Sequence, residues 1–188
     1  WLLVGTIPLA TPTSASTLKA AFDQACQHQM SIALDVNWRP TFWDGAADPA
    51  AGPSSDAIAV MRPLLEQAAL IKLAREEAIW LFGSGDPQFI GDQLPQAPDV
   101  VVTDGAEPVR WWMDGASGTQ PAFQPPQVVD TTGAGDAFTA GLLHRWAAAP
   151  AERIRFAAAC GALVCGGKGG IDPQPTEAQV VAFLGGVS

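Results

Sequence analysis

Several features that mark whole classes of protein are scarce in this chain of 188 residues. No stretch approaches the roughly 18 apolar residues of a membrane span. The apolar start, residues 1–9, lacks the basic flank and cleavage site of a signal peptide. Basic residues number 10 against 19 acidic ones, so the formal net charge is −9. This balance argues against nucleic acid and anionic membranes as partners, because both repel negative charge.

Cysteine and histidine are also sparse. Three cysteines, an odd number without a Cys-x-x-Cys pair, fit a reduced, cytoplasmic setting. Cys26, Cys160 and Cys165 all occur in apolar or small-residue helical patterns, which predicts buried structural thiols. His28 and His144 lie far apart, and neither has a cluster of other ligand-like residues near it, which argues against a zinc site.

The chain does contain one informative run, Asp-Thr-Thr-Gly-Ala-Gly-Asp at residues 130–136, between two valines and a small-residue, apolar stretch. The pattern predicts a strand, a tight glycine turn and a helix. Such a turn leaves main-chain N–H groups free at a helix N-terminus, where the dipole favours an anion such as phosphate. A carboxylate at that place, Asp136, suits proton abstraction from a hydroxyl that attacks a phosphoryl group. The alternative is an ordinary turn in which Asp136 caps the helix.

Length and residue periodicity predict a single α/β domain with a sizeable core. Strands are expected at residues 1–4, 31–36, 69–73, 100–103 and 109–113, before the glycine turn, and near Phe123. Helices are expected at residues 16–27, 54–67, 75–82, about 135–147, 151–165 and after Thr176, with a loop at 41–53 and mostly irregular chain at 85–98. Strands that alternate with helices indicate a mostly parallel sheet, in which ligands bind beyond the C-terminal strand ends.

Extended through Leu143, the run at 130–136 resembles the C-terminal signature of the PfkB (ribokinase-like) family of carbohydrate kinases. The resemblance implies a ribokinase-like three-layer α/β/α fold. In that family the Gly-Ala-Gly turn is the anion hole and the last Asp is the catalytic base. Those roles therefore fall on Gly133, Ala134, Gly135 and Asp136. Residues 1–188 would form the C-terminal part of a single kinase domain, without the N-terminal strands, most sugar contacts and small β lid of the family.

A second segment, Asp-Val-Asn-Trp-Arg-Pro at residues 35–40, resembles the Asp-x-Asn-x-Arg segment of the fructokinase and ketodeoxygluconate kinase branches. Asp35 and Asn37 can fix the loop, while Arg39 offers a planar charged fork to a phosphate or a substrate carboxylate. The alternative for Arg39 is a salt bridge that braces the loop. Trp38 and Trp43 can stack on a ligand or pack internally.

The segment Lys-Leu-Ala-Arg-Glu-Glu at residues 72–77 corresponds to the family's Asn-x-x-Glu motif, whose Glu helps to organise Mg²⁺ through water. Glu77 aligns with that Glu, and Ala74 replaces the Asn. Acidic residues also stabilise the first turn of any helix, which is the alternative for Glu76 and Glu77. Lys72 either reaches the same phosphates or ends its strand in solvent.

Two further segments resemble the family's nucleotide loops. Thr103 and Gly105 belong to a Val-Thr-x-Gly element that lies along the nucleotide, although Pro108 replaces a second glycine common in the family. Gly167 and Gly169 belong to a Gly-Gly-Lys-Gly-Gly loop that helps to enclose the adenine. The alternative for this loop is a flexible passage from helix to coil.

The resemblance also makes Asp130 and Thr132 contributors to a K⁺ site, and Thr132 a residue of the phosphate side. The expected activity is ATP-dependent phosphorylation of a sugar hydroxyl with Mg²⁺, and it is closest to that of a fructokinase. The expected location is the cytoplasm, and the full-length protein could form a homodimer. The alternatives are a 2-keto-3-deoxygluconate kinase, a ribose or nucleoside kinase, or a truncated, non-catalytic nucleotide-binding remnant. A dinucleotide-dependent oxidoreductase is disfavoured, because Phe138 stands where Gly-x-Gly-x-x-Gly requires glycine.

Overall fold

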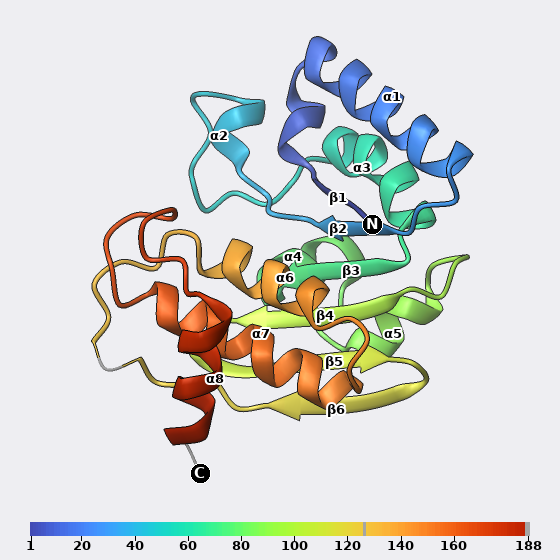
Figure 1. Cartoon of the computed structure of the whole chain (residues 1–188). Coiled ribbons are helices and arrows are strands. Elements are labelled where there is room, and N and C mark those ends of the chain that lie inside the picture. The colour runs from blue at the N-terminus through green and yellow to red at the C-terminus, as the bar shows by residue number, and fades with distance from the viewer. Residues whose placement is uncertain (126, 187–188) are drawn as a thin grey trace. The chain divides into compact units, whose positions relative to one another are not determined.

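The computed structural model describes residues 1–125 and 127–186, and within them six strands form one sheet in the order β1-β2-β3-β4-β5-β6 (Figure 1). The strands are β1 (Leu2–Gly5), β2 (Ile32–Asp35), β3 (Leu70–Ala74), β4 (Asp99–Asp104), β5 (Glu107–Met113) and β6 (Ala116–Gln120). The helices are the 3-10 turn η1 (Ile7–Ala10), α1 (Pro12–Gln27), α2 (Pro40–Trp43), α3 (Ser55–Gln67), α4 (Arg75–Phe82), α5 (Pro87–Asp92), α6 (Ala134–His144), α7 (Pro150–Val164) and α8 (Glu177–Gly186). Within the described ranges, no helix combines the length and the apolar character that a membrane crossing needs.

The first four strands pair in parallel, which confirms the predicted mostly parallel α/β sheet. Two-residue turns then join β4 to β5 and β5 to β6. In the second turn Asp114 and Gly115 have φ values of 51° and 76°, the positive values that tight hairpins require. The strand expected near Phe123 is therefore wrong: the Asp-Gly turn places the last strand earlier, at β6.

Two local expectations differ from the structure. Residues 41–53 are not all loop, because Pro40 opens the one-turn helix α2, a position where its missing N–H is harmless. The strand expected directly before the glycine turn is also wrong, because residues 127–129 form none. Val128 and Val129 are 62% and 51% exposed, so neither valine is buried as a strand residue of a core would be.

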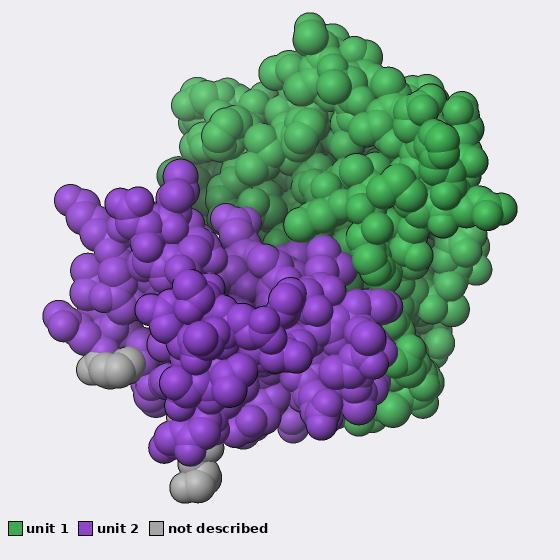
Figure 2. Space-filling model, in the orientation of Figure 1, with its two compact units in different colours: residues 1–104, 110–117 green, residues 105–109, 118–188 purple. Residues whose placement is uncertain are grey.

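The chain divides into two compact units, drawn in different colours in Figure 2. Unit 1 consists of residues 1–104 and 110–117, and unit 2 of residues 105–109 and 118 onward.

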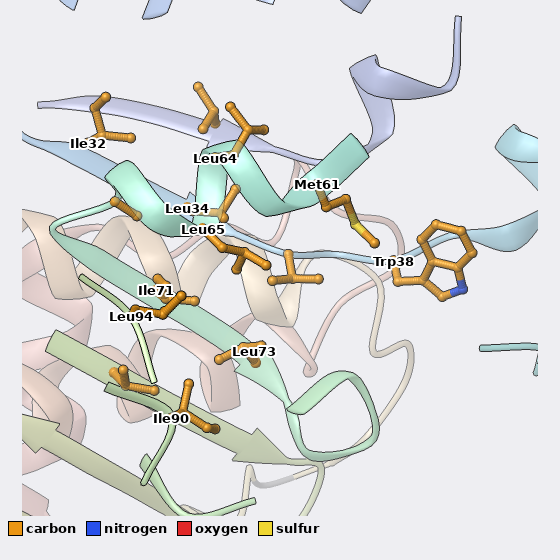
Figure 3. Packing of buried hydrophobic residues seen from close by; sticks show 14 of the residues in the cluster. Ile32, Leu34, Trp38, Met61, Leu64, Leu65, Ile71, Leu73, Ile90 and Leu94 are labelled. Carbon is orange, nitrogen blue, oxygen red and sulfur yellow. The ribbon is translucent and has the colours of Figure 1, made fainter. Parts of the chain in front are cut away.

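The core of unit 1 follows the two-residue period of its strands (Figure 3). Alternate residues of β2, β3 and β4 enter one hydrophobic cluster with α1, α3, α4 and α5. Ile71 and Leu73 of β3 belong to it, and Met61 of α3 is fully buried in it. The intervening residues, Lys72 and Ala74 among them, therefore project from the opposite face of these strands.

In unit 2, α6 and α7 pack closely because small residues line their contact. A Cβ added at Gly141 would lie 2.7 Å from the Cys160 Sγ, so this crossing requires glycine. Cys160 is buried, and burial raises its thiol pKa to about 11. Cys165 is half-buried and Cys26 is exposed, so the expectation of three buried thiols is wrong for Cys26.

We expect Met61→Ala to destabilise the protein by about 2–5 kcal/mol, because it removes a fully buried side chain and leaves a cavity. The neighbouring Val60→Ala, on the same helix but at a 47% exposed position, serves as the control and should change the stability by less than about 0.5 kcal/mol. Denaturant unfolding of both variants measures the difference. Equal effects would contradict the assignment of Met61 to the core.

Candidate active site

The carboxyl ends of β2 and β3 carry a buried ion pair. Asp35 and Lys72 are direct neighbours in the parallel register, and the Lys72 Nζ lies 3.1 and 3.2 Å from the two carboxylate oxygens of Asp35. Each residue is only 8% exposed. The expectation that Lys72 ends in solvent is therefore wrong. A contact between Lys72 and a phosphate stays a prediction, and it would compete with Asp35 for the ammonium.

Glu77, in the first turn of α4, is buried and accepts two main-chain hydrogen bonds. Its Oε2 accepts from the amide of Ala74 at 2.7 Å, as first-turn acids often do at a helix start. Its Oε1 accepts from the amide of Trp38 at 2.6 Å, across 39 residues of sequence. Burial raises the pKa of Glu77 above its usual value, while the two amides and Lys72 act in the opposite direction. The alternative of simple helix stabilisation accounts for only one of these two bonds.

The segment after β2 holds Arg39 at the surface. Asn37 has a φ of 44°, in the left-handed region that asparagine tolerates better than most residues. The Arg39 Nη1 donates to the Trp38 carbonyl at 2.8 Å. Within residues 1–125 and 127–186 its guanidinium forms no ion pair, so the bracing salt bridge is wrong and the charge remains available to an anion.

The two tryptophans of this segment pack together rather than stand open. Trp38 is buried, and its ring centroid lies 5.2 Å from that of Trp43. The Trp38 indole N–H also donates to the Ala51 carbonyl at 2.8 Å. Internal packing, one of the two interpretations of Trp38, is confirmed.

The end of β4 carries the predicted nucleotide residue of unit 1. Thr103 lies opposite Ala74 in the register, and its hydroxyl donates to the Leu73 carbonyl at 3.3 Å. Next to it, Asp104 forms an exposed ion pair with Arg75 at 3.6 Å. Gly105, in unit 2, has a φ of 55° and begins the turn that follows β4.

The glycine turn of unit 2 opens α6. Gly133 is the N-cap residue with a φ of 80°, a conformation that only glycine adopts readily. The Ala134 amide donates to the Thr131 carbonyl at 3.2 Å. The amides of Gly135 and Asp136 have no acceptor among the described residues, as expected at a helix start.

Asp130 joins this turn to the glycine-rich loop at residues 166–170. Its carboxylate accepts from the Thr132 hydroxyl at 2.7 Å, the Thr132 amide at 2.9 Å and the Gly169 amide at 2.9 Å. These bonds, led by the Thr132 hydroxyl, lower the pKa of Asp130 from 3.8 to about 2. A Cβ added at Gly133 would lie 2.7 Å from the Gly170 Cα, so the two segments touch through glycine. The structure thus brings together residues that were predicted from two separate motifs.

Asp136 is exposed, and its carboxylate forms no hydrogen bond or ion pair with any described residue. The N-cap of α6 receives no side-chain hydrogen bond. The alternative in which Asp136 caps the helix is therefore wrong, and the carboxylate is left open to solvent beside two open amides.

One residue outside the predicted motifs supports the site. Thr6, buried directly after β1, donates from its hydroxyl to the Val36 carbonyl at 2.6 Å. Its signal in the sequence is a polar residue directly after an apolar strand; Asp35 and Thr103 also occur near the C-terminal ends of their strands. The partnership of Asp130 with Gly169 had no comparable signal, because 39 residues separate them.

Unit 2 also contains a pocket of about 330 Å³, whose lining begins at Ala137, the residue after Asp136. It is lined by side chains of α6, α7 and α8, including Phe156 and Val180, and none of the predicted site residues lines it. His144 and Glu177 at its rim lie 3.6 Å apart. The pocket is mostly apolar, and we assign it no role in catalysis.

The fold belongs to the open α/β class, in which ligands bind beyond the carboxyl ends of the strands. Comparison with known proteins narrows this class. Residues 3–177 match the pfkB family of carbohydrate kinases, and the chain belongs to that family.

The most similar relatives include several fructokinases. The fructokinase of Vibrio alginolyticus is 31% identical, over 98% of this chain and 61% of the relative. A double mutant of fructokinase from Vibrio cholerae O395, solved with fructose, ADP and a potassium ion, is 30% identical with a TM-score of 0.79, over 98% of this chain and 60% of that chain. Aminoimidazole riboside kinase from Salmonella enterica, solved with aminoimidazole riboside and an ATP analogue, is 25% identical with a TM-score of 0.79, over 98% and 62%. The chain therefore spans about three-fifths of each of these proteins.

We expect Asp130→Asn to remove a pH-dependent part of the stability. Because the folded pKa of Asp130 lies below its ordinary value of 3.8, the ionised carboxylate stabilises the fold fully above about pH 4, and this contribution is lost as the pH falls toward 2. Thermal unfolding between pH 2 and 6 should show wild type and variant converging at the acidic end. Asp172→Asn, at an exposed position in the same loop region, serves as the control for the loss of one surface carboxylate. A constant gap between wild type and Asp130→Asn would contradict the assignment.

Proposed function

We propose that the protein containing this chain is an ATP-dependent sugar kinase of the fructokinase type. The observation that carries the proposal is the start of α6, where the exposed carboxylate of Asp136 stands beside main-chain amides that no described residue occupies. An acceptor-only group beside open donors is the combination that phosphoryl transfer to an alcohol needs. Membership of the pfkB family supports the same activity.

In this proposal Asp136 accepts the proton of a primary sugar alcohol as that oxygen attacks the γ-phosphorus of ATP. The bond from phosphorus to the β,γ-bridging oxygen breaks, and ADP leaves with the electron pair. The amides of Gly133, Ala134 and Gly135 are assigned to the charge on the transferred group. The Ala134 amide already donates to Thr131, so the open amides of Gly135 and Asp136 are the better placed donors. Catalysis of this kind rests on positioning and on electrostatics.

Nucleotide binding is assigned to Thr103, Gly105, Gly167 and Gly169, with Lys72 as a further phosphate contact. Gly105 and Gly169 both have positive φ, which lets main chain approach a ligand closely. The Thr103 hydroxyl keeps its acceptor lone pairs after donating to Leu73.

Mg²⁺, when bound, would neutralise charge on the phosphates and align them for transfer. The described residues contain no group of three or more His, Cys, Asp or Glu side chains that could hold a metal by themselves. This fits an ion that is held chiefly by phosphates and water, as Mg²⁺ commonly is. Glu77 is assigned to its outer shell through water, because each of its oxygens retains one lone pair.

K⁺ binding is assigned to Asp130 and Thr132. Both oxygens of Asp130 already accept hydrogen bonds from Thr132 and Gly169. The low pKa of this carboxylate keeps it charged, which a cation would favour. The K⁺ dependence of turnover tests this assignment.

Fructose is the preferred acceptor because residues 35–40 resemble the fructokinase branch, and relatives of that name match the chain. Asp35, Asn37, Arg39 and Thr132 are assigned to the substrate and phosphate side. 2-Keto-3-deoxygluconate and ribose or a nucleoside are the alternatives. ATP binding without phosphorylation of fructose, 2-keto-3-deoxygluconate, ribose or a nucleoside would favour a non-catalytic nucleotide-binding role instead.

We expect Asp136→Asn in the intact protein to lower kcat by about 10²–10⁴-fold, because the general base is lost while the shape is kept. The affinity for ATP, measured by calorimetry, should stay close to that of wild type. Glu152→Gln provides the control, since Glu152 is also an exposed acid in a first helical turn. Near-normal turnover in Asp136→Asn would sink the assignment of the base.

A further inference from the structure

Glu77 connects two strand ends that are far apart in the sequence. One carboxylate oxygen accepts from the amide of Trp38, beyond β2, and the other from the amide of Ala74, at the end of β3. At 2.6 and 2.7 Å both bonds are short, as charge-assisted hydrogen bonds are. Glu77 is 5% exposed, so water competes little for either oxygen.

The segment that Glu77 holds cannot easily keep its shape alone. Asn37 has a φ of 44°, and a positive φ is strained for a residue with a side chain. The flanking bonds fix the main chain around it: Thr6 donates to the Val36 carbonyl, and Glu77 accepts from the Trp38 amide. The next residue is Arg39, whose guanidinium reaches back to the Trp38 carbonyl. Trp38 is therefore fixed at its amide, its indole and its carbonyl, and Arg39 takes its position from it.

The neighbouring ion pair helps to stabilise the buried carboxylate of Glu77. A buried carboxylate is disfavoured unless donors or a positive charge compensate it. The positive charge of Lys72 favours the ionised form of Glu77, whereas the negative charge of Asp35 disfavours it. The pairing of Lys72 with Asp35 at 3.1 Å offsets that second carboxylate. The three side chains thus form one buried group in which Glu77 is committed to main-chain amides.

We propose that Glu77 is a positioning residue that fixes the main chain at residues 37–39 and thereby places the Arg39 guanidinium for the acceptor. This role rests on the proposed kinase function, and it is separate from any action of Glu77 on the metal. The motif at residues 74–77 thereby gains a second role, which is to position a side chain that contacts the sugar.

The experiment compares Glu77→Gln with Glu76→Gln, an exposed acid one position earlier in the same helical turn. Glutamine keeps the shape but has one acceptor oxygen, so one of the two amides loses its partner. In the intact protein we expect the KM for the sugar to rise about tenfold or more in Glu77→Gln. The KM for ATP should stay within about twofold of wild type, whereas the half-activating Mg²⁺ concentration reports separately on the outer-shell role of Glu77. Glu76→Gln should match wild type in all three.

A second comparison asks whether the effect passes through Arg39. Arg39→Ala should raise the KM for the sugar by itself, and adding Glu77→Gln to it should have little further effect, because residues that act through one another are not additive. Fully additive effects would overturn the proposal. A shifted Mg²⁺ requirement with an unchanged KM for the sugar would overturn it as well.

Hydrogen exchange provides a test that needs no kinase activity. The Trp38 and Ala74 amides should exchange far more slowly in wild type than exposed loop amides such as that of Gly45, for which no described residue provides an acceptor, and at least one of them should speed up in Glu77→Gln. This separates failure of the positioning role from failure of the proposed function. If Glu77→Gln does not fold, the wild-type exchange rates still decide: a Trp38 amide as fast as the exposed loop amides overturns the proposal.

Discussion

The parallel register of β2, β3 and β4 is the constraint on which the candidate site of unit 1 depends. It places Asp35 beside Lys72 and Ala74 beside Thr103, all on the face opposite the hydrophobic cluster. Because side chains alternate along a strand, a slip by one residue would exchange the core face with the polar one. The same pairing that buries Ile71 therefore also builds the site, so that packing and chemistry cannot be varied separately.

Much of the fold could be predicted because its signals are local. Apolar strands and helical periodicity identified the order of strand and helix, and Arg75–Phe82 was predicted with the bounds of α4. Two expected strands are absent, each for an identifiable reason. The Asp-Gly pair at residues 114–115 is a strong hairpin signal, and it places the last strand directly after the turn rather than near Phe123. The two valines before the glycine turn read as a strand, but a strand also needs a partner, and partners are not visible in the local sequence.

The candidate site divides in the same way. The glycine turn and its Asp136 could be found from the sequence because one short run encodes them. The distant partners of Lys72, Glu77 and Asp130 could not, because these bonds join residues 37 or 39 positions apart. Lys72 illustrates the difference: its residue type suggested phosphate or solvent, and only the register revealed the neighbouring Asp35. Sequence motifs thus indicated which residues matter, whereas the three-dimensional pairing determined what each one touches.

The close approach of Gly133 to Gly170 has a consequence for how this protein can change. The contact is asymmetric, because a Cβ added at Gly133 would lie 2.7 Å from the Gly170 Cα, whereas a Cβ added at Gly170 would meet its nearest neighbours at 3.4 Å, an ordinary contact. A larger residue at Gly133 would require a shift of the loop at residues 166–170, and the bond from Gly169 to Asp130 opposes such a shift. Among sequences that keep this contact, position 133 should remain glycine, whereas position 170 can accept a small side chain. A library that randomises position 133 while the other loop stays fixed would sample mostly chains in which the two segments no longer fit.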